Sequence, residues 1–578
     1  MIRILFSTRA TAAAVAASLA LVPCPAAAQA QAAVGSAAAA AAPLPRKRAP
    51  RPTTPAITAA DLMTRLYVLA DDSMMGRQAG TEYNIKGTAY IAAEAKRAGL
   101  LPAGDSGTYF QNVPLVRRTF SASSKLSVDG APLAIWSDYA PLPGRGLARG
   151  TGTSPVVFGG VWGDSAHALT ATQAAGRVVV YTITGTPPRS APRVRAGSPL
   201  ADAAAIVLVG PDQLTPAYVA SVQRPTVTLV PSNAAEAARA AVPVAMVVTP
   251  AVAARMLGGP LSSAQVGAAG RTVTAALVFE ETPAPARNVV AVLPGGDAGL
   301  KGEYVALGAH NDHIGFTDRP TDHDSLRAAN ARAWEMAGRY PGMPPLGAEQ
   351  RASIRVNVDS LRKLSPARRD SIDNGADDDG SGSVALLEIG EALARARTTP
   401  RRSVLFVWHT GEELGLLGSR WFSDHPTVPR DSIVAQINID MIGRGGAADM
   451  KGGGPYYLAL VGSRRLSTEL GDLVESVNRG QRHPLTLDYA LDANGHPENI
   501  YCRSDHYNYA RWGIPVVFLT TGLHGDYHQV TDEPQYIDYT HMARITRFVN
   551  DLTLRVANLN HRVVVDKPKP DPTGTCQQ

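Results

Sequence analysis

Two adjacent glutamates, Glu412 and Glu413, stand shortly after the apolar run "SVLFVW" in the stretch "VWHTGEELGLLG". Neighbouring side chains cannot point the same way on a strand or a helix, so the two carboxylates face different surroundings. An acidic pair at this place is also typical of the solvated start of a helix, where it meets the positive end of the helix dipole. The polar residues elsewhere in the chain decide between these interpretations.

Histidines and aspartates stand beside other apolar runs in a similar way. In an open α/β sheet, ligands bind outside the carboxyl ends of the strands, so polar groups at those ends are expected to meet. The groups are His310 and Asp312 in "YVALGAHNDH", Asp377, Asp378 and Asp379 in "NGADDDGSGS", Asp440 in "AQINID", and Tyr527 and His528 after "IPVVFLTTGLHGD".

These residue types fit metal-dependent hydrolysis. Two histidines and three carboxylates can hold two zinc ions if one carboxylate bridges them, which leaves each ion an open position for water. Ions roughly 3.5–4 Å apart polarise a carbonyl and lower the pKa of a bridging water, but a base must still take its proton. With Glu413 as a ligand, Glu412 points elsewhere and is the candidate base.

Apolar strands and helical segments alternate from residue 287 onward, as in "NVVAVLPG", "GSVALLEIGEALARA" and "GIPVVFLTTG". Near-continuous apolar strands between helices predict an α/β fold with a mixed, largely parallel sheet sandwiched by helices. Residues 317–373 interrupt this pattern with polar, partly helical sequence. We interpret them as a surface insertion that could act as a lid.

Residues 150–275 have a different composition, in which short β-branched runs such as "RVVVYTI" alternate with Pro-, Gly- and Ala-rich connections. This predicts a mostly-β insert without chemistry of its own. The predicted divisions of the chain are a signal peptide (1–28), a disordered Ala/Pro-rich linker (29–56), an N-terminal part of the catalytic domain (57–149), the insert (150–275), the main part of the catalytic domain (276–560) and a C-terminal tail (561–578).

The start of the chain predicts export. A basic first segment, the uncharged run "ATAAAVAASLALV" and "AAA" before Gln29 are typical of a secretory signal peptide cleaved after Ala28. This run is shorter than the about 18 residues that span a bilayer, and no later run is long enough. We therefore expect a secreted or periplasmic protein without stable membrane insertion, in which Cys502 and Cys576 could form a disulfide.

The formal net charge of +6 comes entirely from residues 1–56, which carry six basic residues and no acidic one. The rest of the chain is electroneutral. Nucleic-acid binding depends on Lys and Arg side chains that neutralise phosphates, so this class of partner has no electrostatic support.

Five motifs, taken in order, resemble the co-catalytic di-zinc metallo-aminopeptidase family that includes bacterial leucyl aminopeptidase, aminopeptidase Y and glutamate carboxypeptidase-like enzymes. The motifs are "GAHNDHIG", "NGADDDGSG", "GEELGLLGS", "INIDM" and "DYHQVTDEP". The resemblance implies the zinc exopeptidase fold. The β insert resembles that family's protease-associated domain.

Matched by position, the resemblance implies two Zn²⁺ ions per chain. It places the bridging aspartate three residues before the Ser of Ser381-Gly382, and a non-proline cis peptide after it. The implied ligands are His310 and Asp440 for one ion, Glu413 and His528 for the other, and Asp378 as the bridge.

The resemblance also implies roles for residues around the ligands. Glu412 is the implied general base, Asp312 orients His310, and Asp532 could orient His528. The phenol of Tyr527 could hydrogen-bond the oxyanion.

Further polar residues, His313, His506 and Asp505, are interpreted as residues at the rim of the site or as structural hydrogen-bond partners. The predicted function is that of a secreted zinc-dependent aminopeptidase that hydrolyses the N-terminal bond of peptides. A di-zinc dipeptidase or a glutamate carboxypeptidase-like enzyme is the alternative with the same chemistry, whereas glutaminyl cyclisation is disfavoured because all five ligands are present. A non-catalytic binding protein would lack a ligand or the base, and neither is missing. The oligomeric state stays open.

Overall fold

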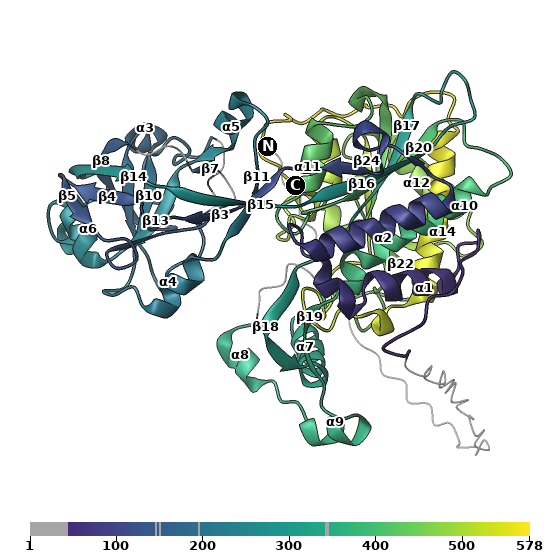
Figure 1. Cartoon of the computed structure of the whole chain (residues 1–578), viewed down its shortest axis with the longest axis horizontal. Coiled ribbons are helices and arrows are strands. Elements are labelled where there is room, and N and C mark those ends of the chain that lie inside the picture. The colour runs from purple at the N-terminus through teal and green to yellow at the C-terminus, as the bar shows by residue number, and fades with distance from the viewer. Residues whose placement is uncertain (1–43, 145–146, 149–151, 193, 195–196, 341–345) are drawn as a thin grey trace, which may run out of the picture. The chain divides into compact units, whose positions relative to one another are not determined.

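The computed structural model describes residues 44–144, 147–148, 152–192, 194, 197–340 and 346–578. Residues 45–578 form one compact unit (Figure 1). The predicted signal peptide and residues 29–43 of the predicted linker lie outside the described residues. Within the described part of the chain, no helix is both long enough and apolar enough to cross a membrane.

A nine-stranded mixed sheet forms the centre of the catalytic domain. Its order is β1-β16-β20-β17-β21-β24-β22-β23, with β2 paired to β16. Pairing is parallel along β20-β17-β21-β24 and antiparallel where β16 and β22 join this group, which confirms the predicted α/β fold with a mixed sheet. The strands are β1 (Leu101–Pro102), β2 (Phe110–Asn112), β16 (Arg287–Leu293), β17 (Tyr304–His310), β20 (Ser403–His409), β21 (Ile433–Ile439), β22 (Tyr457–Val461), β23 (Thr486–Asp488) and β24 (Val516–Thr520).

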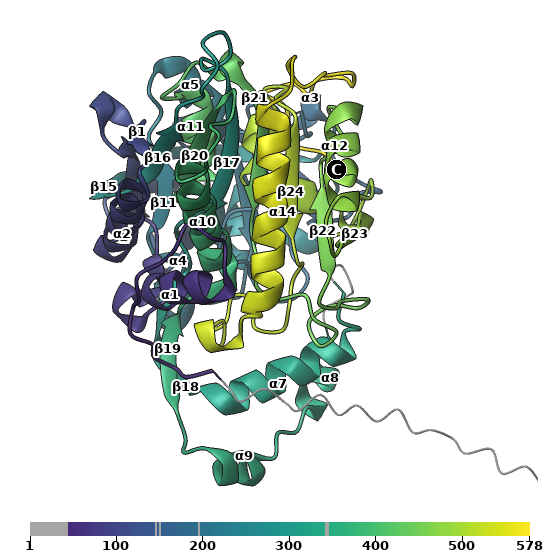
Figure 2. The ribbon, with the colours of Figure 1, turned by 90° about the vertical axis from the view of Figure 1, so that its right-hand side faces the viewer.

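Helices cover both faces of this sheet, as alternate residues of β20 show. The indole N–H of Trp408 donates a hydrogen bond to the carbonyl of Ser383 in α10 (2.9 Å). Leu405 and Val407, on the other face, share a core with Phe422 of α11. In Figure 2, α10 and α14 run side by side along the sheet, and they contact each other. The helices are α1 (Ala59–Leu69), α2 (Glu82–Ala98), α10 (Gly382–Ala394), α11 (Leu417–Asp424), α12 (Thr468–Arg479), α13 (His506–Ala510) and α14 (Tyr539–Ala557).

The insert is built on an eight-stranded sheet of order β5-β4-β14-β8-β9-β10-β13-β6. Alternate residues of β9 belong to two different cores, Val178 and Val180 to one and Val179 and Tyr181 to the other, so both faces are buried. The strands are β4 (Lys125–Val128), β5 (Ala131–Leu133), β6 (Tyr139–Pro141), β8 (Thr153–Val161), β9 (Val178–Thr182), β10 (Ala205–Val209), β13 (Val244–Val248) and β14 (Ala269–Ala276). Because β4 to β6 belong to this sheet, the insert begins earlier in the chain than the residue 150 that the change in composition suggested.

Smaller elements complete the insert. A three-stranded sheet of order β11-β3-β15 stands where the chain enters and leaves it, and β12 pairs with β7. These elements and the helices are β3 (Leu115–Phe120), β7 (Leu147–Ala148), β11 (Thr226–Leu229), β12 (Ala241–Val242), β15 (Phe279–Ala284), α3 (Ala171–Ala174), α4 (Pro216–Val222), α5 (Ala234–Ala240) and α6 (Pro250–Leu257).

The predicted surface insertion is an arm, residues 315–373, made of a two-stranded antiparallel ribbon and three helices (Figure 1). Strand β18 (Gly315–Asp322) leads out and β19 (Arg369–Asp373) returns. Between them lie α7 (His323–Met336), α8 (Ala348–Ser353) and α9 (Val358–Leu364).

Residues 45–56, which composition assigned to a disordered linker, lie against the catalytic domain, so that part of the prediction is corrected. The hydroxyl of Thr53 donates to Glu391 (2.8 Å) and accepts hydrogen bonds from Arg65 (3.1 Å) and Arg97 (2.7 Å). Arg65 also pairs with the buried Glu388 (2.7 Å). Thr53 thus completes a buried charge cluster between α1, α2 and α10, a role that an Ala- and Pro-rich composition cannot reveal.

Candidate metal centre

The central parallel strands bring candidate ligands to one edge of the sheet. His310 is the last residue of β17, Glu412 and Glu413 follow β20, and Asp440 directly follows β21. Because β17 pairs in parallel with both β20 and β21, the carboxyl ends of the three strands lie next to one another.

Asp378, in the turn before α10, lies between two histidines. Its Oδ1 is 3.0 Å from Nε2 of His310, and its Oδ2 is 3.1 Å from Nε2 of His528. Oδ1 of Asp440 lies 3.7 Å from the same nitrogen of His310, and Oε2 of Glu413 lies 3.0 Å from that of His528. The structure therefore brings together two groups of possible ligands that share Asp378.

A third histidine joins the second group. His313 is buried, and its Nδ1 is 2.8 Å from Oε1 of Glu413 and 3.8 Å from Oδ2 of Asp378. In both groups the possible ligand atoms lie within 4.8 Å of one another. From the sequence, His313 is expected at the rim of the site or as a structural hydrogen-bond partner; the available signal for a place beside the ligands is its spacing in His310-Asn-Asp-His313.

Asp532 supports the turn that carries Asp378. Its two carboxylate oxygens accept hydrogen bonds from the backbone N–H groups of Asp377 (3.0 Å) and Asp378 (3.1 Å). The expectation that Asp532 orients His528 is therefore corrected, because both its oxygens hold the backbone of the turn. The peptide bond between Asp378 and Asp379 is cis, as the family resemblance implied.

His310 is fixed by Asp312 and Asp379. Its Nδ1 lies 3.0 Å from the backbone carbonyl of Asp312, and its backbone N–H donates to the carboxylate of Asp379 (3.0 Å). The carboxylate of Asp312 lies 3.8 Å from the same Nδ1 and accepts a hydrogen bond from the backbone N–H of Glu412 (3.2 Å). A partner on Nδ1 orients the ring and leaves Nε2 for a metal ion.

Glu412 and Glu413 point to different partners. Oε2 of Glu412 lies 4.0 Å from Nε2 of His310, whereas Oε2 of Glu413 lies 3.0 Å from Nε2 of His528. Burial, together with Glu413 and Asp440, raises the pKa of Glu412 well above its usual range. A buried carboxylate whose pKa is raised is suited to accept a proton near neutral pH.

The composition of the cluster fits divalent cations. Four carboxylates lie close together in a buried site, and carboxylates so placed need compensating positive charge to ionise together. Although burial acts to raise it, hydrogen bonds with His310 and His528 hold the pKa of Asp378 well below its usual range, so this side chain is ionised. A set of imidazole nitrogens and carboxylate oxygens without sulfur suits zinc.

An apolar pocket lies beside the cluster. Its volume is about 470 Å³, which includes the solvent-filled space at its opening. The phenol of Tyr527 lies 3.4 Å from Nη2 of Arg503, and both residues line the pocket. Its lining includes three carboxylates and five apolar side chains, which we call the apolar wall. The carboxylates are those of Asp378, Glu412 and Asp440, and the apolar wall consists of Met441, Leu491, Ile500, Phe518 and Leu523.

Two buried histidines near the site have structural partners. Nε2 of His409 lies 2.9 Å from the hydroxyl of Tyr509, and its Nδ1 lies 3.3 Å from Asp505. The ring of His506 stacks on Phe518 with 4.8 Å between centroids, and burial lowers the pKa of His506 to about 3. His506 is therefore a neutral packing residue.

Residues 288–553 match the model of peptidase family M28. Leupeptin-inactivating enzyme 1 of Streptomyces exfoliatus is 30% identical over 151 residues, which cover 26% of this chain and 31% of that protein. A probable leucine aminopeptidase of Arthroderma otae is 28% identical over 206 residues, which cover 34% of this chain and 50% of that protein. The chain thus spans half or less of the length of these two relatives.

Solved structures of similar proteins include an aminopeptidase from Aneurinibacillus sp. strain AM-1, with a TM-score of 0.44 and 14% identity, covering 89% of this chain and 97% of that chain. Another is BSAP, a zinc aminopeptidase from Bacillus subtilis, with a TM-score of 0.41 and 15% identity, covering 86% and 95%.

The matched range 288–553 contains both glutamates, all the candidate ligands and the parallel strands at whose ends they meet. The match also agrees with the five motifs read from the sequence. Residues 288–553, which carry all of these candidate ligands, are therefore similar to peptidase family M28, and a probable leucine aminopeptidase is among the proteins that this chain resembles.

Proposed function

We propose that this protein is a secreted aminopeptidase that removes N-terminal residues from peptides with two zinc ions. The observation that carries the proposal is the position of Asp378 between His310 and His528, each with a further carboxylate beside it. The apolar pocket next to this cluster supports a peptide substrate.

When bound, zinc ions would polarise the scissile carbonyl and lower the pKa of the attacking water. The proposed ligands are His310 and Asp440 for one ion, Glu413 and His528 for the other, and Asp378 between them. Glu412 then takes the proton from the water and returns it to the leaving amine.

Tyr527 is the proposed donor to the oxyanion that forms at the carbonyl. Burial raises the pKa of Tyr527 well above its usual value, which keeps the phenol protonated. Arg503, 3.4 Å from the phenol oxygen, adds a positive charge at the same place. A donor and a cation aimed at developing negative charge stabilise the transition state.

The lining of the pocket favours a substrate with a free amine and an apolar first residue. The carboxylates in its lining suit an ammonium group, and the apolar wall suits a side chain such as leucine. Among the described lining residues, Arg503 supplies the one basic side chain, and it already pairs with Glu498. If Arg503 instead holds a substrate carboxylate, the enzyme is a dipeptidase or a carboxypeptidase.

A set of blocked peptides separates these activities. Zinc-loaded protein is given a leucine-led tripeptide in four forms: free, N-acetylated, C-amidated and blocked at both ends. We expect leucine to be released from the free and C-amidated forms only. Cleavage of the N-acetylated form with a free C-terminus points to a carboxypeptidase, and cleavage of dipeptides alone to a dipeptidase. Zinc-loaded protein that cleaves none of them would be a binding protein.

Export and the nature of the insert belong to the same proposal. Cys502 and Cys576 are joined by a disulfide, which suits an oxidising compartment. The insert, with a sheet and two cores of its own, is the proposed protease-associated domain.

A further inference from the structure

One wall of the apolar pocket has little regular structure of its own. We call residues 490–505 the pocket loop; it contributes Leu491, Ile500 and Arg503 to the lining. Two short helical turns, 490–492 and 500–502, flank residues 493–499, which form no helix or strand and are exposed or half-buried. Such a segment needs contacts from elsewhere to keep two lining residues in place.

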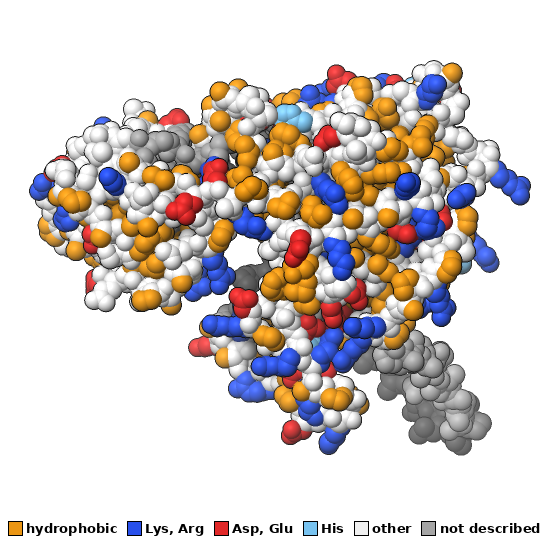
Figure 3. Space-filling model, in the orientation of Figure 1, with side chains coloured by type: hydrophobic (Ala, Val, Ile, Leu, Met, Phe, Trp, Pro, Cys, Tyr) orange, Lys and Arg blue, Asp and Glu red, His pale blue; other side chains and the backbone are white. Residues whose placement is uncertain are grey.

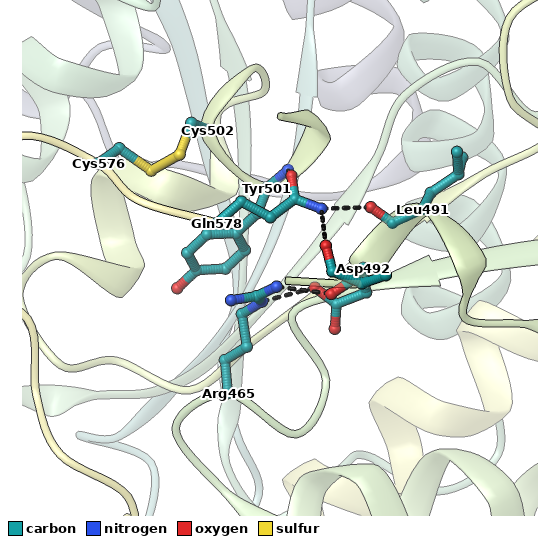
Figure 4. The surroundings of a disulfide bond; sticks show 8 residues. Arg465, Leu491, Asp492, Tyr501, Cys502, Cys576 and Gln578 are labelled. Atoms are coloured by element: carbon teal, nitrogen blue, oxygen red, sulfur yellow. Dashed lines mark hydrogen bonds and ion pairs between the residues drawn. A yellow bond between two sulfur atoms is a disulfide. The ribbon is translucent and has the colours of Figure 1, made fainter. Parts of the chain in front are cut away.

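Gln578 supplies these contacts with one side chain. Its Oε1 accepts a hydrogen bond from the backbone N–H of Tyr501 (2.8 Å). Its amide nitrogen donates to the backbone carbonyls of Leu491 (2.6 Å) and Ala493 (3.1 Å), and its own carbonyl accepts from the N–H of Gly495 (2.9 Å). The amide therefore ties the outgoing and returning ends of the pocket loop together (Figure 4).

A covalent bond holds Gln578 in place. The disulfide between Cys502 and Cys576 joins the segment that ends in Gln578 to the residue next to Arg503 (Figure 4). On the catalytic-domain side, Arg465 bonds both the carboxylate and the carbonyl of Asp492 (2.6 Å each). The pocket loop is thus held by Arg465 from the domain and by Gln578 from the chain's C-terminal segment.

The end of the pocket loop also contacts a candidate metal ligand. The hydroxyl of Ser504 donates to Oδ2 of Asp440 (2.7 Å) and accepts a hydrogen bond from Asn438 in β21 (2.8 Å). Ser504 is buried and anchored by the sheet, whereas Leu491 and Ile500 lie on the part that Gln578 ties. Loss of the Gln578 contacts should therefore change the apolar wall more than the metal centre.

We propose that Gln578, held by the Cys502–Cys576 disulfide, is a positioning residue that fixes the apolar wall and thereby sets the preference for bulky apolar N-terminal residues. This inference rests on the proposed aminopeptidase function. A leucine side chain reaches the wall formed by Leu491 and Ile500, whereas an alanine side chain is too short to depend on it.

The test compares leucine-led and alanine-led peptides in the zinc-loaded wild type and in Gln578→Ala. We expect the KM for the leucine peptide to rise roughly tenfold, because the loss of a few hydrogen bonds has about that effect on an equilibrium. The kcat for the alanine peptide and the zinc content should stay unchanged. Gln577→Ala, at the exposed neighbouring position, is the matched control and should behave as the wild type.

The variant Gln578→Glu distinguishes the role of the amide oxygen of Gln578 from the role of its amide nitrogen. It keeps an acceptor for Tyr501 but loses the donors to Leu491 and Ala493, so its leucine preference should also fall. Reduction of the wild type with a phosphine that leaves zinc in place should reproduce the effect without a mutation. Hydrogen exchange of residues 490–505 should become faster in Gln578→Ala and in the reduced protein.

Unchanged leucine preference and unchanged exchange in these proteins would overturn the inference. Equal losses for leucine and alanine peptides would also overturn it, because they would indicate a general loss of structure. Failure of the proposed aminopeptidase function gives a different result from failure of this inference, because the wild type itself would then cleave neither peptide. The hydrogen-exchange measurement would still report on the role of Gln578.

Discussion

Glu412 and Glu413 are adjacent in the sequence, yet their side chains contact different histidines. Glu413 lies 3.0 Å from His528, whereas Glu412 lies 4.0 Å from His310 and lines the pocket. Strand β20 ends just before them, and the chain turns there through Gly411 with a positive φ of 67°. One carboxylate can therefore hold metal while its neighbour faces the substrate, so two adjacent acids can have two different roles.

The two glutamates should respond differently to loss of charge. In Glu412→Gln the shape is kept but the proton acceptor is lost, so kcat should fall by about 10²–10⁴-fold with zinc content unchanged. In the matched variant Glu413→Gln a ligand is lost, so zinc content itself should drop. Steady-state kinetics with elemental analysis of both variants checks this. A Glu412→Gln protein with wild-type kcat would contradict the assigned base.

At this scale, sequence reasoning could select the acids and histidines that meet, because His310, Glu412, Glu413 and Asp440 stand at or shortly after the ends of apolar runs and Asp378 stands just before a helix. It could not place His313 beside Glu413 or Ser504 beside Asp440, since these contacts depend on how loops return to the sheet. Asp532 was expected beside His528, but its carboxylate satisfies backbone N–H groups that only the folded turn presents.

At the scale of elements, Glu533 is one of the residues that anchor the arm to the catalytic domain, and it binds two residues of the arm. Arg368 binds both oxygens of Glu533 (2.7 and 2.6 Å), and Nε2 of the buried His323 lies 3.1 Å from the same carboxylate. Both partners stand at the end of the ribbon that leads to the helices, where β18 passes into α7 and just before β19 begins. The indole of Trp334 in α7 adds a hydrogen bond to the carbonyl of Asp449 (2.5 Å). The arm is thus attached at defined points.

This anchor predicts a specific acid sensitivity. Although burial acts to raise it, His323 and Arg368 lower the pKa of Glu533 to about 2. Since this folded-state pKa lies below the unfolded value of about 4.3, Glu533 contributes up to about 3 kcal/mol above that pH, and the contribution is lost as pH falls toward 2. Glu533→Gln should therefore be less stable than the wild type near neutral pH, and the difference should shrink as the solution is acidified.

Unfolding by denaturant at a series of pH values measures this difference. Glu349→Gln, at an exposed position of α8, is the control and should follow the wild type throughout. A Glu533→Gln deficit that does not change with pH would show that the anchor acts through shape rather than through charge.

The elements that the sequence predicts best are those whose burial produces a recognisable pattern of apolar residues in the sequence. Strands β17, β20, β21, β22 and β24 are buried on both faces, so they form nearly continuous apolar runs in the sequence. The limits of the insert and of the linker were less predictable. Strands β4 and β6 are short and pair with β14 and β13, far along the chain. Thr53 is ordered by Arg65, Arg97 and Glu391, the last of which lies 338 residues away.

At the scale of the whole molecule, separate ranges of the chain form the catalytic domain and the insert. Residues 57–112 and 286–560 build the catalytic domain on either side of the insert, and each candidate ligand comes from the second part. On the face shown in Figure 3, basic and acidic side chains are interspersed, which agrees with the electroneutral composition after residue 56. A neutral surface with a carboxylate-lined pocket supports selection of peptides by their terminus and first side chain rather than by long-range attraction.

Zinc titration of chelator-treated protein tests whether two metal ions share Asp378. Zinc bound per chain is counted by elemental analysis, and peptide hydrolysis is measured at each addition. We predict two zinc ions per wild-type chain, full activity only when both are bound, and loss of the pair in Asp378→Asn because the shared ligand is removed. Saturation of binding and activity by a single ion, or two tightly bound ions in Asp378→Asn, would contradict the account.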